Sequence, residues 1–126
     1  MEVKTDLDYY TFISANPKFT GCVIDYGGDK AWFLNGLKHR EDGPAIEWAD
    51  GNKAWFLNGL QHREDGPAVI DANGSKSWYL NGKRHRTDGP AIEWVNGTKA
   101  WWLNGEFTTE EQVTRLHKLE GFINGS

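Results

Sequence analysis

The residues best suited to chemistry in this chain are a histidine and an aspartate that recur together in three places. The motif His-Arg-x-Asp begins at His39, at His62 and at His85. A histidine close to a carboxylate can exchange protons near neutral pH, and both side chains are common metal ligands. The motif therefore raises two hypotheses, acid–base catalysis and metal binding, and both depend on how the three copies are placed in space.

The spacing of the copies argues against both hypotheses. Equivalent residues of a repeating β-sheet that lie two strands apart are separated by about 10 Å. Zinc holds histidine nitrogens at about 2.1 Å, so three histidines from three repeats cannot share one ion. A catalytic site also needs different groups in different roles, whereas this motif is copied with few changes. We expect no metal site, no cofactor and no catalytic residue, and we predict that the protein is not an enzyme.

The motif belongs to a longer repeat. Trp32, Trp55, Trp78 and Trp101 follow one another at intervals of 23 residues, and each precedes an aromatic residue and then Leu-Asn-Gly. Three copies continue through His-Arg into Asp-Gly-Pro-Ala. A partial copy from Val23 to Lys30 opens the array, and the fourth copy breaks off after Gly105. A period kept this strictly predicts one structural unit used several times.

The unit has the features of β-structure. Asn-Gly between apolar runs is typical of a two-residue hairpin turn, because both residues tolerate positive φ. Trp-aromatic-Leu favours a strand, and in Asp-Gly-Pro the glycine is expected to supply backbone freedom while proline fixes φ. The sequence predicts a mainly β fold, an antiparallel meander of hairpins with about two strands per repeat.

A helix is expected to follow the array. Thr108 or Thr109 can cap its first turn, and an apolar stripe of Val113, Leu116 and Leu119 can cover the end of the sheet. Gly121 is the expected stop.

A second helix is predicted before the array. Thr5 opens a capping box ahead of Tyr9, Tyr10, Phe12 and Ile13, and Asn16-Pro17 should end the helix. We therefore expect a single domain over 1–126, with an N-terminal cap at 1–20, the repeat array at 21–107 and a helical cap at 108–126.

Side chains alternate along a strand, so the first strand of each repeat has two apolar faces. Trp32 and Leu34 share one face, and Phe33 points to the other. One face should form the core. The other carries the row Phe33, Phe56, Tyr79 and Trp102, which is either packed within the protein or available to a partner.

The third His-Arg loop differs from the first two. It reads Lys83-Arg84-His85-Arg86-Thr87, so a threonine replaces the glutamate of the other copies and two cations are added. This predicts a basic patch that could recognise an acidic protein surface or a phosphate. The candidate partner-binding residues are Arg40, Arg63, Lys83, Arg84, His85, Arg86, Phe33, Phe56, Tyr79 and Trp102. The alternative for the histidines and arginines is structural, with each histidine bonded to backbone of the loop and each arginine paired with a nearby carboxylate.

Composition narrows the class of protein. The chain has 14 Lys and Arg against 18 Asp and Glu, which disfavours nucleic-acid binding. The chain has no run of 18 apolar residues, so no membrane span is predicted. It has no apolar segment behind Met1, so no secretory signal is predicted. A lone cysteine, Cys22, fits a reducing compartment, so the expected location is the cytoplasm.

The repeat resembles the MORN repeat over Val23 to Gly105. An aromatic residue, an Asn-Gly turn, a basic or histidine-containing stretch and a glycine recur at similar spacing, although Trp-aromatic-Leu and Asp-Gly-Pro-Ala replace the usual aromatic-Gly and Gly-x-Gly elements. The units look closer to MORN-like proteins of tailed bacteriophages. That resemblance implies a β-hairpin array that serves as an interaction scaffold, here an inhibitor of a host defence protein in the host cytoplasm.

Three functions remain open at this point. The favoured one is a protein-binding module that uses the aromatic row and the Arg/His edge, since these residue types are enriched in interface hot spots. A module that sequesters a small nucleotide between aromatic rings and arginines is the first alternative. A structural scaffold that associates with itself through exposed sheet edges is the second.

Overall fold

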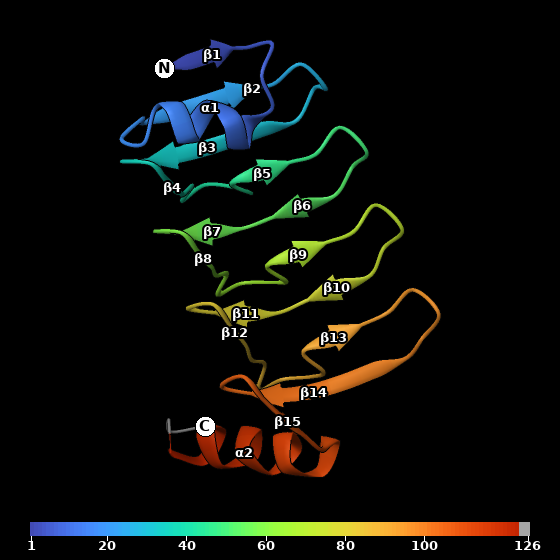
Figure 1. The fold of residues 1–126 in the computed structure, drawn as a ribbon. Coiled ribbons are helices and arrows are strands. Elements are labelled where there is room, and N and C mark those ends of the chain that lie inside the picture. Colours follow the sequence, from blue (N-terminus) through green and yellow to red (C-terminus); the bar gives the residue numbers. More distant parts are fainter. Residues whose placement is uncertain (124–126) are drawn as a thin grey trace.

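The computed structural model describes residues 1–123 and shows a ladder of short strands with one helix near each end of the chain (Figure 1). The main sheet is antiparallel except for its first pair, β1 with β2. Its strands lie in the order β1 (Glu2–Lys4), β2 (Gly21–Ile24), β3 (Lys30–Leu34), β5 (Ile46–Glu47), β6 (Lys53–Ala54), β9 (Val69–Ile70), β10 (Lys76–Ser77), β13 (Ile92–Glu93), β14 (Lys99–Leu103) and β15 (Glu106–Thr108). The predicted mainly β array of hairpins is confirmed.

A second set of hairpins, made by the Asn-Gly turns, runs along one edge of the ladder (Figure 1). In each turn the asparagine has φ 50 and the glycine φ between 82 and 84, the left-handed pair that a type I′ turn requires. The strands involved are β3 with β4 (Leu37–Lys38), β7 (Phe56–Leu57) with β8 (Leu60–Gln61), β11 (Tyr79–Leu80) with β12 (Lys83–Arg84), and β14 with β15.

Each full repeat contains two hairpins, so the expectation of about two strands per repeat is wrong. In the second unit β6 and β7 are separate strands: β6 pairs with β5 and β9 in the main sheet, whereas β7 pairs with β8 in a two-stranded sheet of its own. The chain then crosses from the Asn-Gly hairpin back to the main sheet through the His-Arg-x-Asp-Gly-Pro loop.

The two faces of the array carry different side chains. We call the face that holds Phe33 and Ala31 the α1 face, and the face that holds Trp32 and Lys30 the α2 face. Side chains alternate along β3 and β14, and the 23-residue repeat extends both faces through the array. The α1 face carries Phe33, Phe56, Tyr79 and Trp102, and the α2 face carries Trp32, Trp55, Trp78 and Trp101.

Helix α1 (Tyr9–Ala15) covers the beginning of the α1 face, across β2 and β3 (Figure 1). The core lies there, where Tyr9 is buried with Val23, Ala31, Phe33 and Ile46. The helix ends at Ala15, before Asn16-Pro17, as the sequence predicts, but it begins later than a cap at Thr5 would place it, because its N-cap is Asp8, which accepts a 2.8 Å bond from the backbone N–H of Thr11. The predicted cap, Thr5, instead accepts a bond from the backbone N–H of Leu7, outside the helix.

Strand β1 was not part of the predicted elements. It lies within the segment assigned to the N-terminal cap and pairs in parallel with β2, with Val3 opposite Val23. It therefore covers the edge of the sheet that the first repeat would otherwise leave unpaired.

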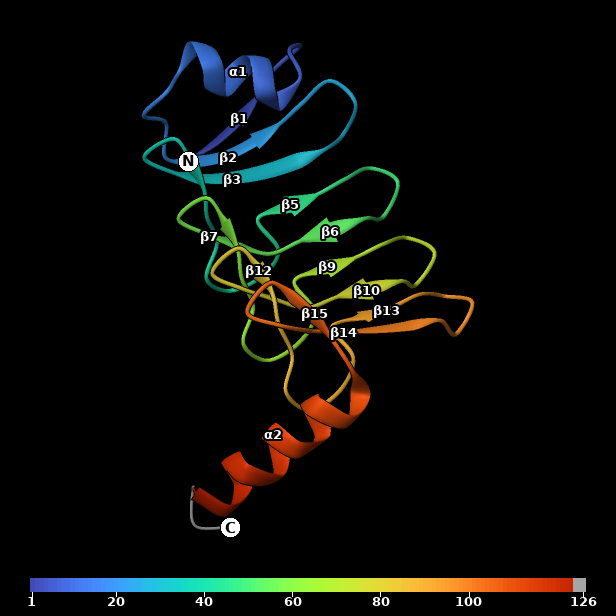
Figure 2. The same ribbon diagram turned by 60° about the horizontal axis from the view of Figure 1, so that its bottom comes forward.

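Helix α2 (Glu110–Ile123) lies at the other end of the array, on the α2 face (Figure 2). Thr109 caps its first turn by accepting a bond from the backbone N–H of Gln112, and Val113 is fully buried. The predicted stop at Gly121 is wrong, since the helix continues to Ile123. A glycine inside a helix costs only about 1 kcal/mol, and no proline follows to end it. No helix of the described part of the chain is long and apolar enough to cross a membrane.

Candidate functional site

The three repeated histidines join neighbouring repeats through hydrogen bonds. Nδ1 of His39 accepts a hydrogen bond from the backbone N–H of Asn58 at 2.9 Å, and His62 and His85 make the same bond to Asn81 and Asn104. Each histidine thus fixes the Asn-Gly turn of the next repeat rather than the loop of its own. Among the described residues, no three His, Cys, Asp or Glu side chains are grouped so as to hold a metal ion.

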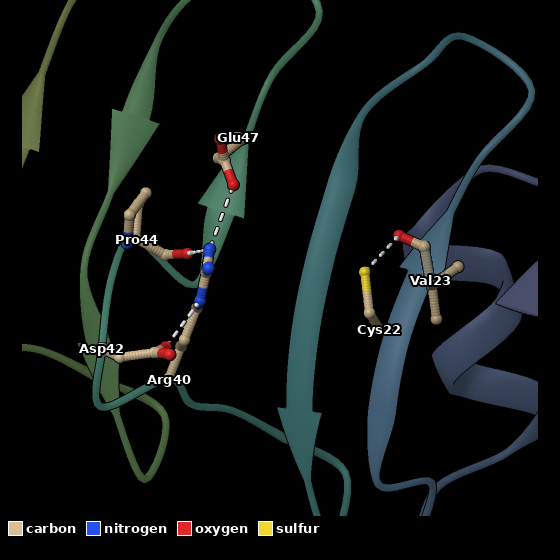
Figure 3. Close-up of polar contacts among 6 residues, drawn as sticks. All are labelled: Cys22, Val23, Arg40, Asp42, Pro44 and Glu47. Atoms are coloured by element: carbon tan, nitrogen blue, oxygen red, sulfur yellow. Dashed lines mark hydrogen bonds and ion pairs between the residues drawn. The ribbon is translucent and has the colours of Figure 1, made fainter. Parts of the chain in front are cut away.

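The arginine beside each histidine is held inside its own repeat. The guanidinium of Arg40 stacks on Trp32, with Cζ 3.9 Å from the ring centroid. Nε of Arg40 donates to Asp42 at 3.0 Å, and Nη1 donates to the carbonyl of Pro44 and to Glu47 (Figure 3). Arg63 and Arg86 repeat the stacking and the bonds to aspartate and proline. These side chains are only 19–25 % exposed, so they stabilise the loop first.

The glycine of Asp-Gly-Pro serves this arginine. A Cβ on Gly43 would lie 3.0 Å from Cζ of Arg40, and one on Gly89 would lie 2.7 Å from Cζ of Arg86. Neither glycine has a left-handed φ. The expected role of backbone freedom is therefore wrong, and the glycine is needed for space.

The middle repeat lacks one ion pair. In the first and third units Nη1 of the arginine also donates to a glutamate, Glu47 or Glu93, at 3.0 Å. Ile70 occupies that position in the middle unit, opposite Lys53 and Lys76 in the register. Arg63 therefore has no counterpart of these glutamates, while Lys53 and Lys76 face Glu47 and Glu93 on their other sides.

Open grooves separate successive His-Arg loops on the α2 face. The first, of about 680 Å³, lies between the loops of Arg40 and Arg63 over Trp55. The next has the same lining one repeat further on, over Trp78. At the third position Val113 and its neighbours in α2 take the place of a fourth loop, next to Trp101. Helix α2 therefore closes a series of grooves that the first two repeats leave open.

The aromatic row on the α1 face is divided into a covered and an uncovered part. Phe33 is buried beneath α1, whereas Phe56, Tyr79 and Trp102 are half-buried. Each of the four is paired across its own hairpin with a second side chain, in order Lys38, Gln61, Arg84 and Phe107. Arg84 lies between Tyr79 and Trp102, with Cζ 5.6 and 5.2 Å from the two ring centroids.

The basic residues of the third loop do not form a single patch. Arg84 lies on the α1 face between the two aromatic rings, and Lys83 is exposed beside the Gly105 turn. His85 accepts a hydrogen bond from the backbone N–H of Asn104, and Arg86 stacks on Trp78. The structure brings Tyr79, Arg84 and Trp102 together with Lys83 at one groove, and it places His85 and Arg86 elsewhere.

Three exposed apolar residues towards the end of the array were absent from the sequence-based set, and one of them, Phe107, lies against Trp102 with 5.6 Å between the ring centroids. They are Trp94, Val95 and Phe107, which are 41 %, 64 % and 70 % exposed. A signal for them was present in the columns of the repeat: Trp94 alternates with aspartate, Val95 stands where Ala49 and Ala72 stand, and Phe107 stands where the other copies have the polar residues Lys38, Gln61 and Arg84.

The single cysteine does not contribute a reactive thiol to any of these surfaces. Cys22 is buried in β2, opposite Trp32, and its Sγ lies 3.9 Å from the carbonyl oxygen of Val23 (Figure 3). Burial raises the pKa of this thiol above its ordinary value, which favours the protonated and unreactive form.

Comparisons of the chain with protein-family models, with curated proteins and with solved structures give no match.

Proposed function

We propose that the protein is a non-catalytic protein-binding module and that its binding surface is the uncovered part of the α1 face. The observation that carries this proposal is the group Tyr79, Arg84, Trp102 and Phe107, whose side chains lie together on this face, with Trp94 exposed on the same face further along the repeat. Exposed aromatic surface beside an arginine is typical of interface hot spots.

The alternative binding surface is the Arg/His edge on the α2 face, and its side chains are already engaged within the protein. Its histidines bond the neighbouring repeat, and its arginines are stacked and paired within their own loops. A partner that used them would have to replace bonds that already hold the array together. The same contacts give the His-Arg-x-Asp motif a structural reason to be repeated.

The partner that we propose is a host protein that this chain inhibits. This choice of partner rests on the likeness of the Trp-aromatic-Leu-Asn-Gly and His-Arg-x-Asp-Gly-Pro-Ala units to repeat proteins of bacteriophages. The mechanism would be steric, because a rigid array seated on an enzyme or on an assembly surface blocks access without any reaction of its own.

Site-specific cross-linking tests the surface directly. A photo-reactive phenylalanine analogue at Phe107, which is 70 % exposed, is expected to cross-link one stoichiometric partner in a bacterial lysate. The matched control carries the analogue at Tyr26, which is 73 % exposed and outside the uncovered group, and it should give no such product. Equal cross-linking at both positions, or none at either, would contradict the proposal.

A second candidate function is binding of a small nucleotide, and one observation favours it. A groove lined by Tyr79, Lys83, Arg84 and Trp102 offers aromatic rings and two cations. Against it, Arg84 already fills the space between the two rings. Calorimetric titration with mono- and dinucleotides separates the two functions, since only a nucleotide binder should release or absorb heat with saturation.

A further inference from the structure

The repeat has a second, longer period. At the position that follows the inner strand, Asp25, Trp48, Asp71 and Trp94 alternate at intervals of 23 residues. The two positions before it alternate in the same way, as Val23-Ile24, Ile46-Glu47, Val69-Ile70 and Ile92-Glu93. The array is therefore two copies of a unit of 46 residues. The second copy should resemble the first in the kind of element that it can bind.

The first copy binds α1. Oδ2 of Asp25 accepts a 3.3 Å hydrogen bond from the backbone N–H of Tyr9 at the start of the helix. The ring of Tyr9 is buried against the core, with Trp48 and Phe56 packed beside it. Nζ of Lys38 lies 5.2 Å from the ring centroid of Tyr10, the next residue of the helix. A carboxylate, an apolar floor and a cation thus hold the first turn of α1.

The second copy presents the same set 46 residues further on. Asp71 replaces Asp25, Trp94 replaces Trp48 and Arg84 replaces Lys38. The register is also the same, because Ser77 pairs with both Val69 and Ile92 as Ala31 pairs with both Val23 and Ile46. We call this group the second helix site, and it consists of Val69, Asp71, Tyr79, Arg84, Ile92, Trp94 and Trp102.

The second helix site has no helix on it. Figure 1 shows α1 over β2 and β3, and no element of residues 1–123 in the same position over β9 and β10. Asp71 is exposed, and within those residues its carboxylate makes no hydrogen bond, whereas that of Asp25 accepts three. Trp94 is 41 % exposed, while its counterpart Trp48 is half-buried against the core.

Two donors in the site also lack acceptors. Nε of Arg84 and Nε1 of Trp102 are buried and have no hydrogen-bond partner in the described part of the chain. Buried donors of this kind are costly unless they are paired. An acceptor on an occupant would reach these atoms only after the side chains around them move, since neither atom is accessible to solvent.

We propose that the second helix site docks a short amphipathic helix of the partner protein, a proposal that rests on the proposed function. The positive N-terminal end of that helix lies on Asp71, and an aromatic side chain in its first turn packs on Ile92 and Trp94. The next residue, which corresponds to Tyr10 of α1, is acidic or an amide, so that it meets Arg84.

A second copy of this chain fits the site less well than a partner helix does. Of the two helices within residues 1–123, α1 is seated on Asp25 and the core, and α2 is seated through Val113 on the α2 face. Either helix would have to leave its own site to reach another molecule. A partner helix has no such cost.

The probe for this site is a peptide of residues 5–18 with a lactam between positions 11 and 15, which are exposed in α1, and with Tyr10→Glu. We expect saturable binding to the intact protein by fluorescence anisotropy. A Tyr10→Lys peptide should bind at least tenfold more weakly. In the protein, Trp94→Ala should weaken binding at least tenfold and Asp71→Asn severalfold. Leu60→Ala, a truncation of similar exposure on the other face, should change it less than twofold.

The results that overturn this proposal are distinct from those that overturn the proposed function. Binding of the probe that is unchanged by Trp94→Ala and Asp71→Asn excludes the second helix site, and so does a concentration-dependent dimer that Trp94→Ala abolishes. If a partner is cross-linked at Phe107 and its affinity is unchanged in Trp94→Ala, the proposed function stands and the helix site is wrong. If the probe binds but no partner is found in the lysate, the helix site stands and the proposed function is wrong.

Discussion

The imidazole of His62 accepts a hydrogen bond from the backbone N–H of Asn81, 19 residues along the chain and one repeat away, at 2.9 Å. The bond joins the His-Arg loop of one unit to the Asn-Gly turn of the next. The histidine of a motif that looks catalytic in the sequence therefore connects two structural units. Side chains that stabilise the array in this way are distinct from those that we propose for binding.

His62→Ala is expected to lower the free energy of unfolding by about 0.5–1.5 kcal/mol, because the Asn81 N–H loses its acceptor in the protein. Urea denaturation measures the change. His62→Asn, which supplies a carbonyl oxygen near the same place, should recover part of the loss. Glu64→Ala should stay within about 0.5 kcal/mol of the wild type, since Glu64 is highly exposed. A loss in Glu64→Ala as large as that in His62→Ala would contradict this role.

Gly89→Ala should destabilise the protein by about 1–3 kcal/mol, because the new methyl group would overlap the guanidinium of Arg86 that stacks on Trp78. Tryptophan emission should report the displaced stack, and thermal unfolding the lost stability. Gly27→Ala is the matched control, since its Cβ would meet only Oδ1 of Asp25 at 3.6 Å and its φ is not left-handed. Equal stability of the two variants would show that the arginine does not need the space.

Ile70→Glu should add the ion pair that the middle repeat lacks. The new carboxylate would lie where Glu47 and Glu93 meet Arg40 and Arg86, between Lys53 and Lys76. A gain of up to about 1 kcal/mol over Ile70→Gln is expected at low salt, and it should shrink as salt is added. The uncharged variant controls for the loss of the isoleucine. If Ile70→Glu is no more stable than Ile70→Gln, the three cations do not converge on this position.

Acid should weaken the third loop through Asp88. The hydrogen bond from Arg86 holds the pKa of Asp88 below its ordinary value of 3.8, so the fold favours the ionised carboxylate. The stability that Asp88 adds is complete above the pKa of the unfolded chain and is lost as pH falls through the lower, folded value. Asp88→Asn should therefore flatten the stability profile below about pH 4. An unchanged profile in that variant would contradict the assignment.

Local signals in the sequence predicted the repeating parts of the fold well. Asn-Gly required a left-handed pair of residues, and Asn58 and Gly59 have it. The end of α1 before Asn16-Pro17 and the cap of α2 at Thr109 also follow from local signals. These features depend on neighbours within a few residues, which is why a single sequence reveals them.

Contacts between repeats could not be predicted in the same way. The acceptor role of His62 depends on how the next unit stacks. Within one unit, the space that Gly66 provides depends on the stacking of Arg63 on Trp55, which local turn signals do not reveal. The pairing of β1 with β2 joins segments that share no repeat. The candidate residues Tyr79, Arg84 and Trp102 did prove to be neighbours, whereas Arg63 and Arg86 are turned into their own loops.

Hydrogen–deuterium exchange of the protein with and without its captured partner tests the central claim most directly. If the uncovered part of the α1 face is the binding surface, exchange should slow over residues 79–84 and 92–108 and stay unchanged in the loops 41–43 and 64–66. Protection confined to those loops, with free exchange over 92–108, would place the partner on the opposite face and contradict the account.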